Sequence, residues 1–580
     1  MGKQSKRIQS LRIKLIYFAA FIVFVVPLIV LLKKINVYDS AYFLFGPIEF
    51  TSDFFTYYKA MALQFGAVIL LIGTVWLRWK ETEKSWKLDL FEVILVSFAF
   101  VVILSFCFSQ FKTVAWSGWI GRFEGTATWL SYVTFTFCIY NLVRTKKEAN
   151  IIMGAFMLST LVISIIGVFQ FLGMDFYQTG LGERLILGSY YENFKGSIDI
   201  ALEKGTVYGT LYNPNYIGSL VALAFPIGLY LISETKSLQW RLIIGIILGL
   251  QLIILAGSKS TTGFVALTIG VVVYFIMFIF QRGFQKKRIV TGVLIIIALI
   301  IGVSQTNLFQ NQYDKLINSL TTVESEYNPF INVSYDEPVL TVTIDDGDKY
   351  HIEPVGYDIK VYDKDWNLLE RQDLEDRHRF RLVNQYDFLV DKIHSTGKIN
   401  VSVTNKALDK GQVMSFDLIN DTQFSLGYNL FTEEKINNDV EVIKLSASER
   451  LFTNRGYIWN RSIPLIMNKP LLGYGADTYI LNFPHMDLIG RPVIMTNDVV
   501  DKPHNIYIQI LINFGFAGGI LFFSLVCYTL SKMRSSLLIA SIIGWLVVGI
   551  ANDSVVFVTY MFFCMMGLAN LFSLENEVSK

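Results

Sequence analysis

The motif DKPHN, residues 501–505, could transfer a proton at the start of an apolar helix. Histidine changes charge near neutral pH, and a neutral imidazole can act as a general base. Asp501 can cap a helix and Pro503 suits its first turn. His504 would then point from the helix N-terminus, where the helix dipole disfavours the protonated ring. The alternative is a histidine that only caps the helix or binds interfacial water.

Three cations in separate motifs could bind a phosphorylated group. Arg122 lies in GRFEG, Arg455 in NRGYIW and Lys259 in GSKS. A guanidinium binds phosphate through two parallel hydrogen bonds, and helix N-termini attract anions, so these groups could together hold a diphosphate. Each cation could instead be an ordinary residue that extends its charge from the bilayer into water. Lys259 lies in a very short turn between two apolar stretches, where little else explains it.

Polar and aromatic residues near these motifs are candidate substrate ligands. Asn505 ends the DKPHN motif, and Tyr457 and Trp459 lie in NRGYIW. The two aromatic rings could stack on a sugar, although such residues are also common at membrane interfaces. Asn215 belongs to YNPNY, in which a cap at Asn213 and the following proline explain a helix start without any ligand.

The composition is that of a membrane protein. Of the 580 residues, 53% are hydrophobic and 17% are charged, against about 25% charged residues in soluble proteins. The net charge of +2 provides no basic surface for nucleic acid. The sequence has no glycine-rich phosphate loop, its histidines lack metal-ligand spacing, and its four cysteines lie in apolar stretches. We therefore expect neither a nucleotide, a metal nor another cofactor.

Apolar stretches long enough to cross a bilayer, which takes about 20 residues, recur along the chain. We expect an all-α polytopic membrane protein with about twelve transmembrane helices, at 15–32, 60–78, 89–108, 126–143, 150–172, 215–233, 241–257, 262–281, 289–304, 505–530, 536–551 and 554–574. Short loops rich in Lys and Arg face the cytoplasm, and a cytoplasmic N-terminus places the short basic loops on that side. Both termini are then cytoplasmic, and residues 305–502 and the candidate residues lie at the outer face.

The large outer segment divides by its hydrophobic pattern. Residues 305–334 form a linker, and residues 335–430 alternate apolar and polar positions between turn signals, which predicts a small inserted β-sandwich. Residues 431–502 place apolar side chains three to four apart, which predicts a helical part against the membrane face. The flanking parts are residues 1–304, with nine of the expected spans, and residues 503–580, with three.

Together the motifs resemble the O-antigen ligase and O-antigen polymerase superfamily of bacterial membrane glycosyltransferases. GRFEGTATWLSY, GTLYNPNYIGSLVALAFP, AGSKSTTGFVAL, NRGYIWNRSIPLI, KPLLGYGADTY and DKPHNIYIQILINFGFAGG occur in the family's order. They fall at the ends of expected spans, with the large loop before the last helices. The resemblance extends over nearly the whole chain except the β insert.

This resemblance implies a metal-independent transfer of a glycan from undecaprenyl diphosphate at the outer face of the cytoplasmic membrane, among membrane lipids. The acceptor hydroxyl would belong to a glycan, a lipid or a protein. His504 matches the family's proposed base, Arg455 a diphosphate-contacting arginine and Arg122 a further outer-face arginine. Lys259 stands where the family commonly has arginine, which keeps the charge but loses the fork geometry. A single displacement would invert the anomeric centre.

Two other functions are compatible with a protein of this class. A transporter of lipid-linked sugars or polysaccharides would need ionisable residues near the middle of the membrane, whereas the charges here lie near the ends of spans. A non-enzymatic surface scaffold would act through the β insert and tolerate substitution of His504 and Arg455. Within the transferase hypothesis, polymerase, ligase and protein O-glycosyltransferase activities are not separated by sequence.

Overall fold

The protein is described here from a computed structural model. The residues that the structure describes are 3–37, 50–82, 87–198, 202–282, 330–336, 338–345, 347–355, 358–374, 377–380, 386–393, 398–405, 410–419, 423–425, 440–443, 449, 451–485, 487, 490, 499–568 and 571.

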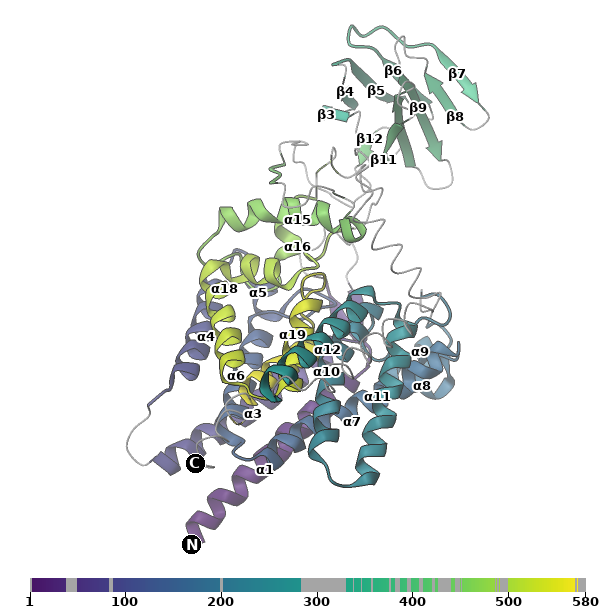
Figure 1. The fold of residues 1–580 in the computed structure, drawn as a ribbon. Helices are drawn as coiled ribbons and strands as arrows, with labels where there is room; N and C mark the ends of the chain where they lie inside the picture. Colours follow the sequence, from purple (N-terminus) through teal and green to yellow (C-terminus); the bar gives the residue numbers. More distant parts are fainter. Residues whose placement is uncertain are drawn as a thin grey trace.

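A bundle of apolar helices forms the body of the protein (Figure 1). These helices are α1 (Lys3–Val25), α3 (Tyr57–Thr82), α4 (Leu90–Phe108), α6 (Thr126–Leu142), α7 (Lys146–Phe171), α10 (Pro214–Glu234), α11 (Leu238–Ser258), α12 (Thr261–Arg282), α18 (Ile506–Lys532), α19 (Ser536–Val548) and α20 (Val556–Leu568). Each expected span coincides with one of them except 289–304, which lies outside the described residues. Within the described residues, seven helices are long and apolar enough to cross a membrane. The mostly helical membrane architecture is confirmed, and the total of about twelve spans stays a prediction.

Shorter elements connect and cover the bundle. They are the helices α5 (Lys112–Ser117), α8 (Gly180–Leu187), α9 (Tyr191–Phe194), α15 (Leu451–Asn468) and α16 (Tyr479–Asn482), the 3-10 turns η1 (Val26–Leu28), η3 (Phe176–Gln178) and η4 (Gly188–Tyr190), and an antiparallel pair, β1 (Lys33–Asn36) with β2 (Phe50–Asp53). α15 and α16 fall in the part of the outer segment where helix was expected.

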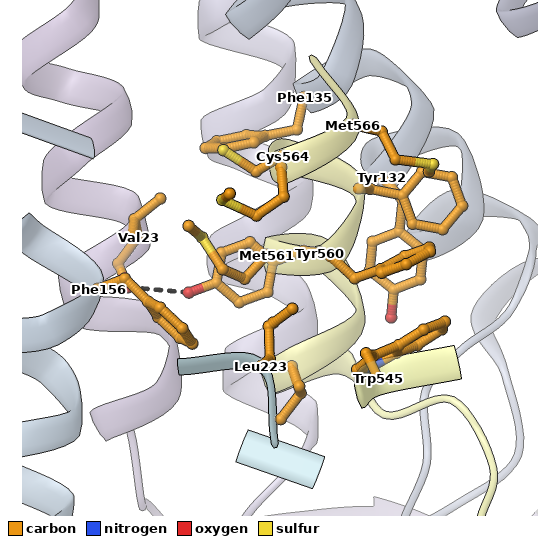
Figure 2. Close-up of a cluster of buried hydrophobic side chains, with 14 of the residues drawn as sticks. Val23, Tyr132, Phe135, Phe156, Leu223, Trp545, Tyr560, Met561, Cys564 and Met566 are labelled. Atoms are coloured by element: carbon orange, nitrogen blue, oxygen red, sulfur yellow. Dashed lines mark hydrogen bonds between the residues drawn. The ribbon is translucent and has the colours of Figure 1, made fainter. Parts of the chain in front are cut away.

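Helix α20 lies in the interior of the bundle (Figure 2). All 13 of its residues are buried. The Tyr560 hydroxyl donates a hydrogen bond of 2.8 Å to the carbonyl of Val23 in α1, and Phe562 stacks on Trp545 of α19 with 3.8 Å between ring centres. This packing holds the residues just before α20 in a fixed place.

The two ends of the bundle differ in their polar contacts. At the C-terminal end of α6, Arg12 donates hydrogen bonds of 2.7 Å to the carbonyl of Leu142 and to Glu148 of α7. Arg78 and Glu92 pair between the end of α3 and the start of α4. Arg12 and Arg78 lie in or next to the short basic segments that were expected to face the cytoplasm. The N-terminal end of α6 instead contacts the candidate residues described below. The contacts of Arg12 and Arg78 and the candidate residues therefore lie at opposite ends of the bundle.

The insert forms two antiparallel sheets. One contains β3 (Phe330–Asp336), β4 (Val339–Ile344), β5 (Lys349–Val355) and β6 (Asp358–Tyr362) in that order, and the other runs in the order β12 (Gln423–Ser425), β11 (Lys410–Ile419), β10 (Lys398–Asn405), β9 (Tyr386–Ile393), β8 (Arg377–Phe380), β7 (Arg371–Leu374). In β4, Leu340, Val342 and Ile344 are buried and alternate with half-buried residues, which is the predicted pattern. The β-rich character is thus observed, and face-to-face packing of the sheets stays a prediction. In Figure 1 the sheets lie beyond α15 and α16.

Candidate functional site

Helix α18 begins later than its sequence suggested. Asn505 is the N-cap, and its side-chain oxygen accepts hydrogen bonds from the backbone N–H groups of Tyr507 and Ile508. The prediction that Asp501 caps this helix is wrong. His504 adopts a left-handed backbone conformation with φ of 50°, so the helix cannot extend through it. Asp501 instead lies 3.7 Å from the Lys502 ammonium.

His504 faces a buried carboxylate. Its Nδ1 atom lies 3.1 Å from Oδ2 of Asp553, in the loop between α19 and α20, and the two side chains are 31% and 1% exposed. Burial raises the pKa of Asp553, but His504, Lys502 and Arg122 together outweigh burial and hold this pKa below its usual range. Asp553 is therefore ionised, and it can orient the imidazole and stabilise its protonated form. The other ring nitrogen, Nε2, is then the one that can accept a proton.

Helix α15 fixes the backbone beside His504 and carries Arg455. The indole N–H of Trp459 donates a hydrogen bond of 3.0 Å to the carbonyl of Pro503. Arg455 precedes Trp459 by four residues and so occupies the same side of α15 one turn away. Burial lowers the pKa of Arg455, and the negative charge of Asp553 opposes that effect. Among the described residues no ion pair of Arg455 is present, which leaves its guanidinium available to an anionic ligand.

Arg122 is held at the same end of the bundle by two carboxylates. Its Nε atom lies 2.8 Å from Oδ1 of Asp477, and its Nη2 atom lies 3.8 Å from Oε2 of Glu124. Burial lowers the pKa of Arg122, but Asp477, Asp553 and Glu124 raise it above its usual value. The Nη1 group is buried and has no hydrogen-bond partner among the described residues. Arg122 is thus a permanently charged, rigid group with one free donor.

A buried polar network joins this arginine to the loop of Asp553. Glu124 accepts a hydrogen bond of 2.6 Å from the Tyr132 hydroxyl and one of 2.7 Å from the Ser554 hydroxyl. Ser554 also accepts from the Gln509 amide of α18 at 2.8 Å. Burial raises the pKa of Glu124 to about 7, against the opposing effects of Arg122 and these hydrogen bonds. The network ties the starts of α6, α18 and α20 together beneath His504.

The motif KPLLGYGAD places Asp477 beneath Arg122. Gly473 and Gly475 have φ of 67° and 104°, as expected for a tight turn. The N–H groups of Tyr474 and Gly475 donate to the carbonyls of Ile512 and Asn513, at 2.8 and 3.1 Å. The backbone of α18 is non-helical at Gly515, just after these two residues, so their carbonyls are available to accept these hydrogen bonds. Oδ2 of Asp477 then accepts from the backbone N–H of Trp119 at 2.7 Å and of Glu124 at 3.2 Å.

Lys502 adds a further cation next to His504. Its ammonium donates a hydrogen bond of 2.9 Å to the hydroxyl of Tyr216, at the start of α10. Burial lowers the pKa of Lys502, but Asp501, Tyr216 and Asp553 outweigh burial and raise it. The motif YNPNY therefore contributes to the site through its second tyrosine, which was not among the predicted residues.

Residues 419–523 match the family described as O-Antigen ligase. This match supports a relationship of the chain to the O-antigen ligase superfamily. No curated protein and no solved structure matches it. The O-antigen ligase domain begins at the last residue of β11 and contains α15, α16, the His504 motif and most of α18. It therefore includes Arg455, whereas Arg122 and Asp553 come from loops outside these residues, between α5 and α6 and between α19 and α20.

The remaining predicted residues have other contacts. Lys259, which ends α11 in a left-handed conformation, forms an exposed ion pair of 2.6 Å with Glu203. Asn215 lies in the first turn of α10, and its carbonyl accepts a hydrogen bond of 3.4 Å from Asn552, next to Asp553. Asn213 caps α10 as expected. No contact in the described structure links Lys259 to His504.

The aromatic candidates and Asn505 are engaged by the protein itself. Tyr457 is fully buried, and the Arg461 guanidinium lies 3.8 Å from its ring centre. Trp459 is 7% exposed. The Asn505 amide donates to the carbonyl of Ile550 at 2.9 Å, while its oxygen caps α18. These side chains therefore position the site in this structure, and their contact with substrate stays a prediction.

The site combines a proton acceptor with several fixed cations. His504 with Asp553 can remove a proton from a hydroxyl group, and Arg455, Arg122 and Lys502 can stabilise negative charge on a leaving group. No group of three or more metal-ligating side chains occurs within the described residues. The sequence could have revealed Asp553 only as a carboxylate at the end of a span, since nothing in its spacing relates it to residue 504.

Proposed function

We propose that the protein is a metal-independent, inverting glycosyltransferase that moves a glycan from undecaprenyl diphosphate to an acceptor hydroxyl. It acts at the outer face of the bacterial cytoplasmic membrane, with both termini in the cytoplasm and the large loop outside. The acceptor belongs to a glycan, a lipid or a protein. The observation that carries the proposal is the 3.1 Å contact between His504 and the buried Asp553, beside an arginine with no described partner.

The reaction is a single displacement. The acceptor oxygen attacks the anomeric carbon of the donor sugar as its proton passes to His504, and the bond from that carbon to the diphosphate oxygen breaks. Asp553 stabilises the imidazolium that forms, which is the role of a carboxylate behind a catalytic histidine. The departing diphosphate carries the bonding electron pair, so it needs cations rather than an acid.

Arg455 is the principal diphosphate ligand in this proposal. It can offer two parallel N–H donors, and no described carboxylate pairs with it. Arg122 is already bound to Asp477 and Glu124, so it contributes charge and its free Nη1 donor from a fixed position. Lys259, which forms an exposed pair with Glu203, has no assigned part in the displacement.

The test compares lipid-linked glycans in the native host that expresses the intact protein or His504→Ala at equal levels. Loss of long or transferred polymer with accumulation of undecaprenyl-diphosphate glycan is expected for His504→Ala, while Lys259→Met keeps the normal profile. Accumulated single repeat units would indicate a polymerase, and accumulated full-length chains a ligase. An unchanged profile in His504→Ala would reject the transferase mechanism and favour transport or a scaffold.

A further inference from the structure

The β insert presents an aromatic ring to solvent on a fixed support. Trp366, in the loop after β6, is 54% exposed. One face of its ring stacks on His351 of β5, with 4.3 Å between ring centres and 5° between the planes. His351 is itself fixed, because its Nδ1 atom lies within hydrogen-bond distance, 2.8 Å, of the Thr341 hydroxyl on β4. The indole therefore has a fixed support on one face and is more than half exposed.

The backbone that carries Trp366 is held in an unfavourable conformation. Its φ is 62°, in the left-handed region that bulky residues rarely adopt. Asp363 maintains this turn, since its Oδ1 accepts hydrogen bonds from the N–H groups of Asp365 and Asn367 at 2.9 and 2.8 Å. The backbone carbonyl of Asp363 also accepts a hydrogen bond of 3.0 Å from the backbone N–H of Trp366. Backbone strain of this kind concentrates at ligand-binding positions.

A hydrogen-bonded pair of polar side chains lies at one edge of the ring. Tyr362 lies at its edge, with 5.5 Å between ring centres, and donates its hydroxyl proton to Glu353 at 3.0 Å. A flat apolar surface bordered by hydrogen-bonding groups matches a sugar ring, which has an apolar C–H face and hydroxyl groups around its edge.

We propose that the Trp366 face of the insert is a binding subsite for an uncharged pyranose of the acceptor or growing glycan. The sugar stacks on the exposed part of the indole, and the hydroxyl groups of the sugar bond to the polar pair at the edge of the ring. This subsite rests on the proposed transferase function. It gives the insert a role in retaining glycan near the site of transfer, separate from the displacement at His504.

The test measures glycan binding by the full-length protein without donor, so no transfer occurs. The probe is the oligosaccharide that mild acid releases from the host's lipid-linked glycan pool, titrated by calorimetry. Trp366→Gly removes the ring and suits the left-handed backbone, and Trp366→Phe keeps a smaller ring. Leu368→Ala is the matched control, because Leu368 is a 60% exposed apolar residue in the same segment.

We expect Trp366→Gly to raise Kd about tenfold or more, Trp366→Phe to raise it less, and Leu368→Ala to leave it unchanged. Unchanged binding by Trp366→Gly, equal losses in Trp366→Gly and Leu368→Ala, or absence of binding by the wild-type protein would each overturn the subsite. The outcome is independent of the His504→Ala experiment. Lost binding in Trp366→Gly together with unchanged transfer in His504→Ala would leave a glycan-binding protein that is no transferase.

Discussion

Replacement of Asp553 by Asn tests the pairing of a histidine with a carboxylate. The substitution keeps the size of a side chain that is 1% exposed and removes its charge. His504 then lacks the group that stabilises its protonated form, while the fold around α20 keeps its packing. We expect a loss of transfer activity with the protein still stable and inserted in the membrane.

The size of the loss follows from the distance between the two groups. Two unit charges 3.1 Å apart interact by about 5 kcal/mol at an effective dielectric constant of roughly 20, and by about 1 kcal/mol in water. Because His504 is partly exposed, an intermediate value of about 3 kcal/mol is reasonable, which corresponds to roughly a hundredfold decrease in rate.

The assay is transfer by purified protein in detergent, with kcat/KM measured between pH 5 and pH 9, roughly the range in which histidine titrates. Asp501→Asn is the control, because Asp501 is 40% exposed, lies in the same motif and pairs with Lys502 rather than with His504. It leaves the contact between His504 and Asp553 in place, so it should cost clearly less than Asp553→Asn. If Asp553→Asn keeps activity within twofold of the wild type, Asp553 does not support a catalytic histidine.

Other substitutions separate the roles of the remaining charges. Arg455→Lys should raise KM for the lipid-linked donor roughly tenfold or more, because one charge-assisted hydrogen bond of the guanidinium fork contributes about 1.5–3 kcal/mol. Lys259→Met should change the transfer rate less than twofold, since the pair of Lys259 with Glu203 is exposed. A tenfold loss of rate would instead support contact between Lys259 and the diphosphate. Glu124→Gln should flatten the pH dependence of thermal unfolding. The pKa of Glu124 rises from 4.5 to about 7 on folding, so the folded state retains the Glu124 proton to a higher pH than the unfolded state does. The free energy of unfolding of the wild type therefore falls by up to roughly 3 kcal/mol as pH increases across that interval. A Glu124→Gln protein with the wild-type slope would contradict this assignment.

The helices were largely predictable because their signal is local. A stretch of about 20 apolar residues specifies a span wherever it packs, and cap residues such as Asn213 mark a helix start within a few positions. The predicted start of α18 was wrong because the DKPHN motif contains two residues, Asp501 and Asn505, that can each cap a helix. Only the left-handed conformation of His504 decides between Asp501 and Asn505, and that conformation depends on contacts with α15 and α20.

The site was only partly predictable because its pairings are long-range. His504 and Arg455 were identified from residue type and motif order, whereas Asp553 reaches His504 only after α18 and α19 have crossed the bundle. Asp477 likewise was not among the predicted residues, yet it binds Arg122 far back in the chain. Lys259 carries an exposed ion pair in this structure, and its contact with phosphate stays a prediction.

The two arginines illustrate how such a site stays folded before substrate arrives. A buried guanidinium without a counter-charge would be costly, and Asp477 and Glu124 remove that cost for Arg122. Those same carboxylates would repel a diphosphate, so Arg122 is suited to build the site more than to bind the leaving group. Arg455 lies on α15, a helix supplied by the outer segment, and lacks such partners among the described residues. The charge that the reaction needs is therefore best placed on Arg455, while Arg122 and its carboxylates secure the loops that face His504.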